Sequence, residues 1–444
     1  MENLLEQIII YGAVVIFLLG VVLVYIRKLR RESRIVEKKI QLAKEEGLYE
    51  PVSLHPVVDP NSCIQSGACV RACPEHDILG IRNGKATVIN ASQCVGHGAC
   101  FHACPTQAIS LFIGTEKRGV DLPHVNHTFE TNVRGMFIAG EMGGMGLIRN
   151  AVEQGKQAVQ NLSKGINSKS NMQFDLIIIG AGPAGISATL EAKRLKLKTL
   201  TLEQDTLGGT VYTFPRAKVV MTSPMDLPLF GKVKLYETSK PELLDLWNDV
   251  LKKNEIKINE KHKVNKITRN EQGFCVECNN GEEYTSQRVL LAIGRRGTPR
   301  KLNVPGEDLP KVTYRLLEPE LISDNKIIVV GGGDSAIESA LLLADTNDVT
   351  LSYRKETFSR LKPKNREKLE EAIKSKSLDV ILNSNVTAID EEFVHLKIAG
   401  QEEVLTMANQ LVYIFAGGEL PTEFLRNAGI EITTKFGEAI LKHA

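Results

Sequence analysis

Two glycine-rich turns, each between an apolar run and a helix-forming run, constrain the fold of this chain more than any other feature. The first follows Leu176–Ile179 and spans Gly180–Gly185 (GAGPAG). The second follows Lys326–Val330 and spans Gly331–Ala336 (GGGDSA). Glycine lets the backbone approach a phosphate closely, and the N-terminus of the following helix attracts its negative charge. The pattern predicts two doubly wound α/β domains, each with a dinucleotide site.

The residues that end the next strand of each domain differ in charge. Glu203 follows the apolar strand Thr199–Leu202, where an acid accepts a hydrogen bond from a ribose hydroxyl. In the second domain the strand that begins at Val349 ends in Arg354 and Lys355, and cations there suit the 2′-phosphate of NADP. A single glycine turn is a weak signal. Two turns in the same strand–turn–helix context, 151 positions apart, disfavour turns that bind no nucleotide.

Several further motifs resemble one known family over residues 111–444. Gly331–Ala336 and Tyr353–Phe358 (YRKETF) are similar to the NADPH domain of thioredoxin-reductase-like flavoproteins. Leu291–Gly294 (LAIG) and Val304–Glu307 (VPGE) are similar to that family's crossover between domains, and Ala416–Pro421 (AGGELP) to its return strand. The resemblance implies FAD in the first domain, NADPH in the second and, by analogy, a homodimer.

Two departures from the family concern its catalytic and phosphate-binding motifs. Thioredoxin reductases carry a C-x-x-C pair between the Pro-Gly-Glu turn and the NADPH glycines, but Leu309–Asn325 contains no cysteine. Disulfide reduction by that route is therefore excluded. The family's basic motif places arginine directly after the phenylalanine, whereas here Ser359 follows Phe358 and Arg360 comes one position later.

A third departure concerns the order of the motifs. The family's flavin signature, T-x3-G-x-F-x-A-G-D, lies near its C-terminus, whereas here the matching Thr131–Glu141 precedes the first glycine turn. Joining His443-Ala444 to Gly114 would restore the usual order, so we expect a circular permutation. The resemblance implies that Glu141 approaches the ribityl chain of the flavin and that a helix from Gly146 covers its ring system. The alternative is a coincidental glycine-rich loop.

A cysteine repeat lies between the N-terminus and the flavin signature. Its two copies are 31 positions apart and share the spacing C-x5-C-x3-C-P, with the cysteines Cys63, Cys69, Cys73, Cys94, Cys100 and Cys104. The segment resembles two-cluster bacterial ferredoxins, in which the fourth cysteine of each run ligates the cluster of the other run. By position, the resemblance implies one set of Cys63, Cys69 and Cys104, and a second of Cys94, Cys100 and Cys73.

The second cysteine of each ferredoxin run is replaced, by Ser66 in the first copy and by His97 in the second. Three thiolates can hold a three-iron cluster, or a four-iron cluster with a different last ligand. His97 is a plausible ligand through its imidazole, and Ser66 is a poorer one because its hydroxyl must lose a proton. The alternatives are a ferredoxin fold without clusters, and a zinc site, whose usual spacing differs.

The N-terminus predicts a membrane anchor. Ile8–Ile26 is 19 residues long without a charge, which at ~1.5 Å per residue spans about the 30 Å hydrocarbon core. Arg27, Lys28 and five further cations follow by Lys39, and the positive-inside rule then places the C-terminal domains in the cytoplasm. The acidic start and the absence of a small-residue cleavage site disfavour a signal peptide. A buried helix is the other alternative.

The remaining features are weaker. Hydrophobic residues make up 43% and charged residues 24% of the 444 residues, as expected for a globular core. The net charge of +2 gives no reason to expect nucleic-acid binding. Cys275 and Cys278 look like a redox pair, but two strand residues three apart point to opposite faces, so we expect them to be incidental. The apolar pattern predicts helices over Gly185–Leu195 and Leu243–Asn254.

The predicted organisation is an α/β protein with a small α+β ferredoxin-like domain. Residues 1–50 form the transmembrane helix (8–26) and charged stalk, 51–113 the iron–sulfur domain, 114–301 with 409–444 the FAD domain, and 302–408 the NADPH domain. The expected cofactor-binding residues are Gly140, Glu141, Gly180, Gly182, Pro183, Ala184, Gly185, Glu203, Gly208, Gly209, Gly294, Gly331, Gly333, Asp334, Ser335, Ala336, Arg354 and Lys355.

The predicted function is a membrane-anchored oxidoreductase that moves electrons between NADPH, FAD, one or two iron–sulfur clusters (4Fe-4S or 3Fe-4S) and an unknown redox partner. Hydride transfer to flavin demands no side-chain acid or base, so no catalytic residue is expected. Two alternatives remain. One is an NADPH-dependent flavin reductase of a small disulfide or quinone with a structural ferredoxin-like domain. The other is a non-enzymatic redox sensor or scaffold at the membrane.

Overall fold

A computed structural model describes the chain except residues 1, 46–48, 52–53, 76, 95, 97, 144–146, 168–169, 215–218, 222–223, 236, 296–297, 359–360, 362 and 444. The chain divides into two compact units, residues 1–120 with 436–444, and residues 121–435. The two crossings between the units are thus at positions 120–121 and 435–436.

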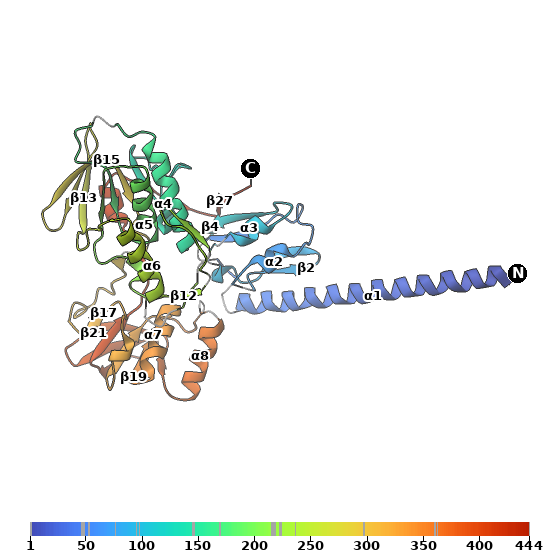
Figure 1. Ribbon diagram of the computed structural model, residues 1–444. Helices are drawn as coiled ribbons and strands as arrows, with labels where there is room; N and C mark the ends of the chain where they lie inside the picture. Colours follow the sequence, from blue (N-terminus) through green and yellow to red (C-terminus); the bar gives the residue numbers. More distant parts are fainter. Residues whose placement is uncertain are drawn as a thin grey trace. The chain divides into compact units, whose positions relative to one another are not determined.

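The first unit begins with the long helix α1 (Glu2–Glu45) (Figure 1). Its apolar residues from Ile10 to Ile26 are exposed, with Phe17 70% exposed. In the described part of the chain α1 is the one helix long and apolar enough to cross a membrane, a judgement by length and composition only. The predicted helical segment 8–26 lies within α1, as do residues 27–45 of the expected basic stalk.

The second half of α1 packs against the iron–sulfur domain. Ile40 and Ala43 are each 2% exposed. A hairpin of β2 (Leu79–Arg82) and β3 (Lys85–Val88) lies against α1. Two ion pairs connect them: Glu37 of α1 with Arg82 of the hairpin at 3.0 Å, and Lys39 of α1 with Asp77 just before the hairpin at 2.6 Å. The stalk is therefore an integral packing element of this domain and not a free tether.

The iron–sulfur domain repeats one short motif twice, as the sequence repeat predicts. Each copy has a helix of five residues that follows a glycine in the left-handed conformation. These helices are α2 (Ala68–Ala72) after Gly67 and α3 (Ala99–Ala103) after Gly98. The strands β1 (Leu54–Val58) and β4 (Ile109–Ile113) pair antiparallel, and a 3-10 turn spans Ala91–Gln93.

The C-terminal strand of the chain also belongs to this unit. β27 (Glu438–Leu441) pairs antiparallel with β4, so the sheet has the order β1-β4-β27. The His443 ring stacks on Phe101 of α3 with a centroid distance of 3.6 Å. The end of the chain therefore covers an edge of the ferredoxin-like sheet.

The second unit contains the FAD-domain sheet, ordered β13-β14-β15-β7-β8 with β6 on β15. The parallel strands are β6 (Met136–Ile138), β7 (Phe174–Ile179), β8 (Thr199–Leu202) and the end of β15 (Glu283–Leu291). The antiparallel part adds β13 (Val264–Arg269) and β14 (Phe274–Cys278). The predicted strand Thr199–Leu202 is confirmed by β8.

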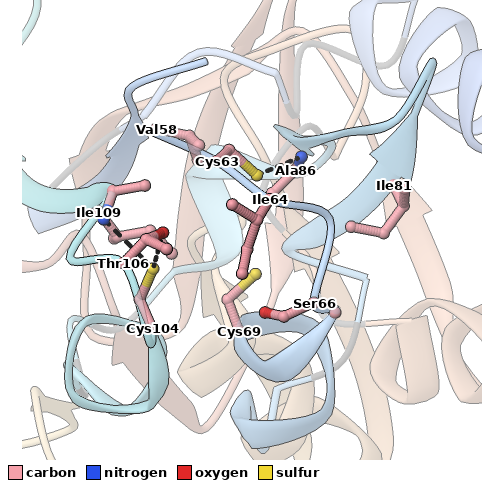
Figure 2. Close-up of a pocket in the computed structure, with 12 residues that line it drawn as sticks. Val58, Cys63, Ile64, Ser66, Cys69, Ile81, Ala86, Cys104, Thr106 and Ile109 are labelled. Atoms are coloured by element: carbon pink, nitrogen blue, oxygen red, sulfur yellow. Dashed lines mark hydrogen bonds between the residues drawn. The ribbon is translucent and has the colours of Figure 1, made fainter. Parts of the chain in front are cut away.

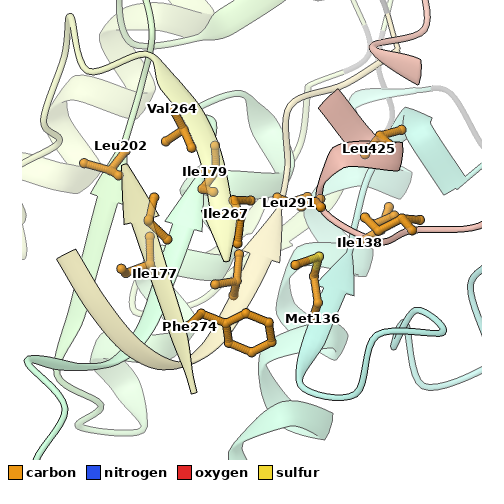
Figure 3. Close-up of a cluster of buried hydrophobic side chains, with 14 of the residues drawn as sticks. Met136, Ile138, Ile177, Ile179, Leu202, Val264, Ile267, Phe274, Leu291 and Leu425 are labelled. Carbon is orange, nitrogen blue, oxygen red and sulfur yellow. The ribbon is translucent and has the colours of Figure 1, made fainter. Parts of the chain in front are cut away.

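One core cluster joins residues from distant parts of the sequence on this sheet (Figure 3). Met136 and Ile138 of β6, Ile177 of β7 and Leu425 of α9 (Thr422–Asn427) are all at most 1% exposed in the same cluster. The segment before the first glycine turn and a segment near the C-terminus are thus both parts of one FAD-domain core.

Three helices accompany the FAD-domain sheet. They are α4 (Ile148–Ser163), α5 (Pro183–Arg194) and α6 (Lys240–Lys253). Helix α5 begins two residues before its predicted start, because Pro183 suits the first turn of a helix. Helix α6 begins three residues before the predicted Leu243, because Ser239 and Glu242 form a capping box.

The second dinucleotide domain has the parallel sheet β17-β24-β18-β19-β20. Its strands are β17 (Val312–Thr313), β18 (Lys326–Val330), β19 (Asp348–Ser352), β20 (Asp379–Ile381) and β24 (Leu411–Ile414). Helices α7 (Asp334–Ala344) and α8 (Pro363–Lys374) accompany it, with an antiparallel sheet of β21 (Ser384–Ile389), β22 (Phe393–Ile398) and β23 (Val404–Ala408).

Short pairs complete the second unit. They are β5 (Val120–Pro123) with β26 (Ile432–Lys435), β9 (Val219–Met221) with β12 (Glu237–Ser239), β10 (Met225–Leu227) with β11 (Gly231–Val233), and β16 (Thr298–Pro299) with β25 (Gly418–Glu419). The last pair lies at the predicted crossover between the two dinucleotide domains. Single 3-10 turns span Glu141–Gly143, Gly209–Val211 and Pro319–Leu321.

Candidate cofactor sites

The first glycine turn packs too tightly at Gly180 and Gly185 to accept a side chain there. Gly180 has a φ of +102°, and a Cβ on Gly185 would lie 1.8 Å from the Gly180 carbonyl oxygen. Gly182 caps the start of α5, with open space around its Cα. The turn therefore presents backbone N–H groups and a helix N-terminus where Pro183 and Ala184 begin the helix, an arrangement that suits a pyrophosphate.

The Glu203 carboxylate lies directly beside this turn. It is 5% exposed and accepts hydrogen bonds from the Ala181 N–H (2.7 Å) and the Asp205 N–H (3.0 Å). Burial raises the pKa of Glu203, and the two backbone N–H groups oppose that rise. This buried carboxylate holds the glycine turn in place. It is also well situated to accept a hydrogen bond from a ribose hydroxyl.

The flavin signature Thr131–Glu141 contacts the first glycine turn. The Gly140 N–H donates to Gln154 Oε1 at 2.8 Å, and a Cβ on Gly140, whose φ is +92°, would lie 3.2 Å from the Cβ of Ala184. Glu141 follows at the start of a 3-10 turn. The structure thus brings Gly140 and Glu141 to the end of α5 where the glycine turn lies.

Helix α4 and helix α5 approach each other closely at a second glycine. A Cβ on Gly155 of α4 would lie 2.1 Å from the Ala184 carbonyl oxygen of α5. The Ser187 hydroxyl donates to the Val152 carbonyl at 2.6 Å, and Gln160 donates to the buried Glu191 at 2.7 Å. The helix that follows the flavin signature therefore packs directly on the helix of the glycine turn.

Gly208 and Gly209 also lie against the first turn. The Gly208 N–H donates to the Ala181 carbonyl at 2.9 Å, and a Cβ on Gly209 would lie 3.4 Å from the Gly182 Cα. Gly294, at the end of the loop after β15, has a φ of +67° with no atom within 4 Å of a Cβ. Four of the predicted FAD residues outside the first turn thus contact it, namely Gly140, Glu203, Gly208 and Gly209.

The second glycine turn repeats this geometry in the other dinucleotide domain. Gly331 has a φ of +148°, and its Cβ would lie 2.6 Å from the Phe415 carbonyl oxygen and 3.0 Å from Ala336. Gly333 caps α7, and Asp334 and Ser335 form its first turn. The Asn365 amide donates to Asp334 at 2.7 Å and to Glu338 at 3.0 Å.

Charged side chains follow the next strand, as the sequence predicts. Arg354 and Lys355 come directly after Tyr353 at the carboxyl end of β19, and both are exposed. The Tyr353 ring lies so close to Gly332 that a Cβ there would be 2.1 Å from it, and it stacks on Phe358 at 5.0 Å. Two exposed cations beside a glycine turn suit a nucleotide that carries an additional phosphate.

The first cysteine set surrounds one small cavity (Figure 2). Cys63, Cys69 and Cys104 line it together with Ser66. Cys63 and Cys69 are buried, and the remaining lining is mostly apolar. The cross-pairing of the two sequence copies, with Cys104 of the second copy beside the first, is that of two-cluster ferredoxins.

Backbone donors point at two of these sulfurs. The Ala86 N–H donates to Cys63 Sγ at 3.4 Å and the Ala108 N–H to Cys104 Sγ at 3.2 Å. Burial raises the pKa of Cys69. Burial acts in the same direction on Cys104, but hydrogen bonds from Ala108 and Thr106 outweigh it and lower the pKa of that thiol. Hydrogen bonds to sulfur stabilise the electron-rich thiolates that hold an iron–sulfur cluster.

The second cysteine set likewise has two buried members, Cys73 and Cys100, and a partly exposed one, Cys94. Burial raises the pKa of Cys94 to about 11 and that of Cys100 to about 12, and the neighbouring thiols contribute to both shifts. Cys73 is among those neighbours for both residues. The structure therefore groups Cys94, Cys100 and Cys73. His97, the predicted fourth ligand, lies outside the described residues.

No three His, Cys, Asp or Glu side chains of the described chain have the spacing to hold a single metal ion. Zinc would require its ligand sulfurs to lie about 2.3 Å from one centre.

Cys275 and Cys278 lie on opposite faces of one strand, as their spacing predicts. Both are free thiols. Cys278 is buried in the FAD-domain core, whereas Cys275 is partly exposed on the same strand β14. Three further residues that the sequence singled out lie outside the described residues, namely Gly146, Ser359 and Arg360.

Comparison with known proteins decides the family. The model of the pyridine nucleotide-disulphide oxidoreductases matches residues 177–442, more than half of the chain. The chain belongs to this family. A 4Fe-4S dicluster domain matches residues 55–105 in addition. This pyridine nucleotide-disulphide oxidoreductase is thus an NAD(P)H-dependent FAD enzyme with a ferredoxin-like domain.

Individual relatives are more distant. This oxidoreductase is 28% identical over 271 residues to the bacilliredoxin reductase Bdr of Bacillus subtilis. The match covers 60% of this chain and 83% of the relative. A ferredoxin–NADP reductase of Ignicoccus hospitalis is 28% identical over 59% and 83% of the two chains. The solved bacillithiol disulfide reductase Bdr of Staphylococcus aureus is 27% identical over 60% and 84%, with a TM-score of 0.52.

Two residues of these sites were not expected from the sequence, and neither was the packing role of a third. Gln154 holds Gly140, Tyr353 packs over Gly332, and Asn365 holds Asp334. Gln154 and Asn365 lie on helices far from the turns in sequence, so no local motif marks them. Tyr353 lies within the YRKETF motif, and its position directly before two cations is the one signal that the sequence offered.

Proposed function

We propose that this oxidoreductase moves electrons between NADPH and a redox partner at a membrane, with FAD and iron–sulfur clusters bound in the same chain. The observation that carries the proposal is the cross-paired cysteine set around one cavity in a chain that belongs to an FAD-dependent family. Bound flavin accepts a hydride and releases electrons singly, which suits it to connect a nicotinamide with one-electron centres.

The FAD-binding part of the proposal rests on the contacts around the first glycine turn. The pyrophosphate would lie against Gly180, Gly182 and Gly185. The Glu203 carboxylate would accept hydrogen bonds from the ribose hydroxyls. Gly140 and Glu141 would lie along the ribityl chain, because Gly140 touches Ala184. The parallel pairing of β6 with β15 supports a circular permutation, since the flavin signature joins the FAD sheet from the N-terminal side.

NADPH binding rests on the second turn. Gly331, Gly333 and the start of α7 would hold the pyrophosphate, and Arg354 and Lys355 would bind the 2′-phosphate. The lack of a C-x-x-C motif in 309–325 supports electron flow to the clusters in place of disulfide chemistry. The separation of Cys275 from Cys278 on opposite faces of β14 supports the same choice.

Membrane attachment rests on the helix α1. The exposed apolar residues of α1 support an anchor, since exposed side chains such as Phe17 lose contact with water in lipid. The basic residues that follow support cytoplasmic C-terminal domains.

Anaerobic reduction of the detergent-solubilised full chain tests the proposal. We expect FAD and iron with sulfide in the purified protein, bleaching of the flavin by NADPH, and a paramagnetic resonance signal of reduced clusters. Absence of iron and sulfide would contradict electron transfer through clusters and would favour a simple flavin reductase. Absence of flavin bleaching would contradict an enzymatic function.

A further inference from the structure

The first cysteine cavity has a hydroxyl where ferredoxins have the second thiol of the run. Ser66 occupies the second position of the first cysteine run, and it lines the cavity together with Cys63, Cys69 and Cys104. Figure 2 shows its oxygen on the side of Cys69. The fold has therefore kept the loop geometry of a four-ligand site, although the sequence alone made Ser66 a poor ligand. The inference below rests on the proposed iron–sulfur function.

The Ser66 oxygen is weakly engaged within the protein. Its one described hydrogen bond is from the Ala68 N–H at the long distance of 3.4 Å. Ser66 is exposed, so a proton that leaves its hydroxyl passes directly to water. Neither a strong hydrogen bond nor a buried path for the proton opposes ligation.

Two cations lie over the backbone of this loop. Arg71 Nη2 donates to the Ser66 carbonyl at 3.1 Å, and Lys85 Nζ donates to the Cys63 carbonyl at 2.7 Å. Positive charge next to a site of anionic ligands stabilises the ionised form of each ligand. The loop thus offsets part of the charge that an alkoxide would add to three thiolates.

Thr106 is the other hydroxyl on the cavity, and its setting is different. Its Oγ1 lies 3.8 Å from Cys104 Sγ and interacts with that sulfur. It follows a ligand cysteine by two positions, where the ferredoxin pattern places no ligand. Thr106 therefore acts on a ligand sulfur, and Ser66 alone stands in a ligand position.

We propose that Ser66 Oγ is the fourth ligand of a four-iron cluster held by Cys63, Cys69 and Cys104. On ligation the Oγ–H bond breaks, an Oγ–iron bond forms and the proton passes to water, with no change in the oxidation state of the cluster. An oxygen ligand at this corner distinguishes the first cluster from the second, whose corresponding position is His97.

The test uses the full chain, purified anaerobically in detergent, as wild type, Ser66→Ala, Ser66→Cys and the matched control Thr106→Ala. The second cluster is common to all four proteins, so differences between them report on the first. Iron is measured per FAD, and paramagnetic resonance spectra are recorded in the oxidised and reduced states. We expect Ser66→Ala to lose one iron per chain and to gain the oxidised-state signal of a three-iron cluster. Ser66→Cys and Thr106→Ala should keep the full iron content.

Two results would overturn the assignment. Identical iron content and spectra in wild type and Ser66→Ala would show that Ser66 is no ligand. A three-iron signal in the wild type that only Ser66→Cys converts to a four-iron signal would show that the corner is vacant. Absence of iron from every variant is a different outcome, since it would overturn the proposed relay itself. An unchanged signal of the second cluster confirms that the iron–sulfur domain of each variant is folded.

Discussion

At the scale of single residues, charge separates the two nucleotide sites. Glu203 follows β8 and Arg354 follows β19, at corresponding points of two similar folds. The double substitution Arg354→Ala with Lys355→Ala should weaken NADPH binding about tenfold or more, as expected for loss of charge-assisted hydrogen bonds of about 1.5–3 kcal/mol. NADH binding should change little. Flavin bleaching titrated with each nucleotide measures both, with Lys374→Ala as the control, and equal losses for the two nucleotides would contradict the assignment.

Glu203 gives a second residue-scale prediction, with a pH dependence. Burial raises the pKa of Glu203, so the folded apo-protein binds its proton more tightly than the unfolded chain does. The wild type should therefore gain stability relative to Glu203→Gln as the pH falls through this raised pKa. At neutral pH the variant should retain less FAD. Urea unfolding of both apo-proteins from pH 7 downward checks the first expectation, and a pH-independent difference would contradict it.

At the scale of elements, the contact of α4 with α5 fixes the flavin signature against the glycine turn. In Gly155→Leu the Cβ alone would lie 2.1 Å from the Ala184 carbonyl oxygen, and the rest of the side chain needs further space. We expect it to destabilise the FAD domain by about 1–3 kcal/mol or more and to release FAD. Gln157→Ala, two positions away on the exposed face of α4, should leave Tm and FAD content unchanged. If Gly155→Leu retained as much FAD as the control, the close approach of α4 to α5 would not be needed for FAD binding.

The packing of α1 on the iron–sulfur domain gives a second element-scale prediction. Ala43 is 2% exposed, whereas Leu42 on the same helix is 54% exposed. Ala43→Asp buries a charge without a partner and should destabilise the iron–sulfur domain by about 3–5 kcal/mol. Leu42→Asp should have little effect. Thermal loss of the cluster absorbance measures the difference, and equal melting of the two variants would contradict this docking.

At the scale of the whole molecule, one described ion pair joins the two dinucleotide domains of the second unit. Arg315 Nη2 lies 2.9 Å from Asp205 Oδ2, and Asp205 also donates its N–H to Glu203. Both side chains are well over one-third exposed, so the pair contributes at most about 1 kcal/mol to stability. Arg315→Ala should therefore leave Tm nearly unchanged but alter the rate of flavin reduction by NADPH. An unchanged rate in stopped-flow measurements would show that the pair does not influence the arrangement of the domains.

The sequence by itself determined the local chemistry of this protein. Glycine turns such as Gly180–Gly185, the acid Glu203, the cations Arg354 and Lys355, and the cysteine spacing all depend on residues close together in the chain, and each kept its expected local setting. The family comparison confirmed the two kinds of domain. Patterns of this kind are legible because backbone conformation, strand period and ligand spacing act over a few residues.

Only the tertiary structure decided which distant residues meet. It placed β27 on the ferredoxin-like sheet, packed Gly155 against Ala184 and docked α1 on the β2–β3 hairpin. None of these contacts has a sequence signature, because they arise from burial of apolar surface between segments far apart in the chain, which is non-directional. Ser66 shows the consequence: its residue type argued against a ligand, and its place in the fold argues for one.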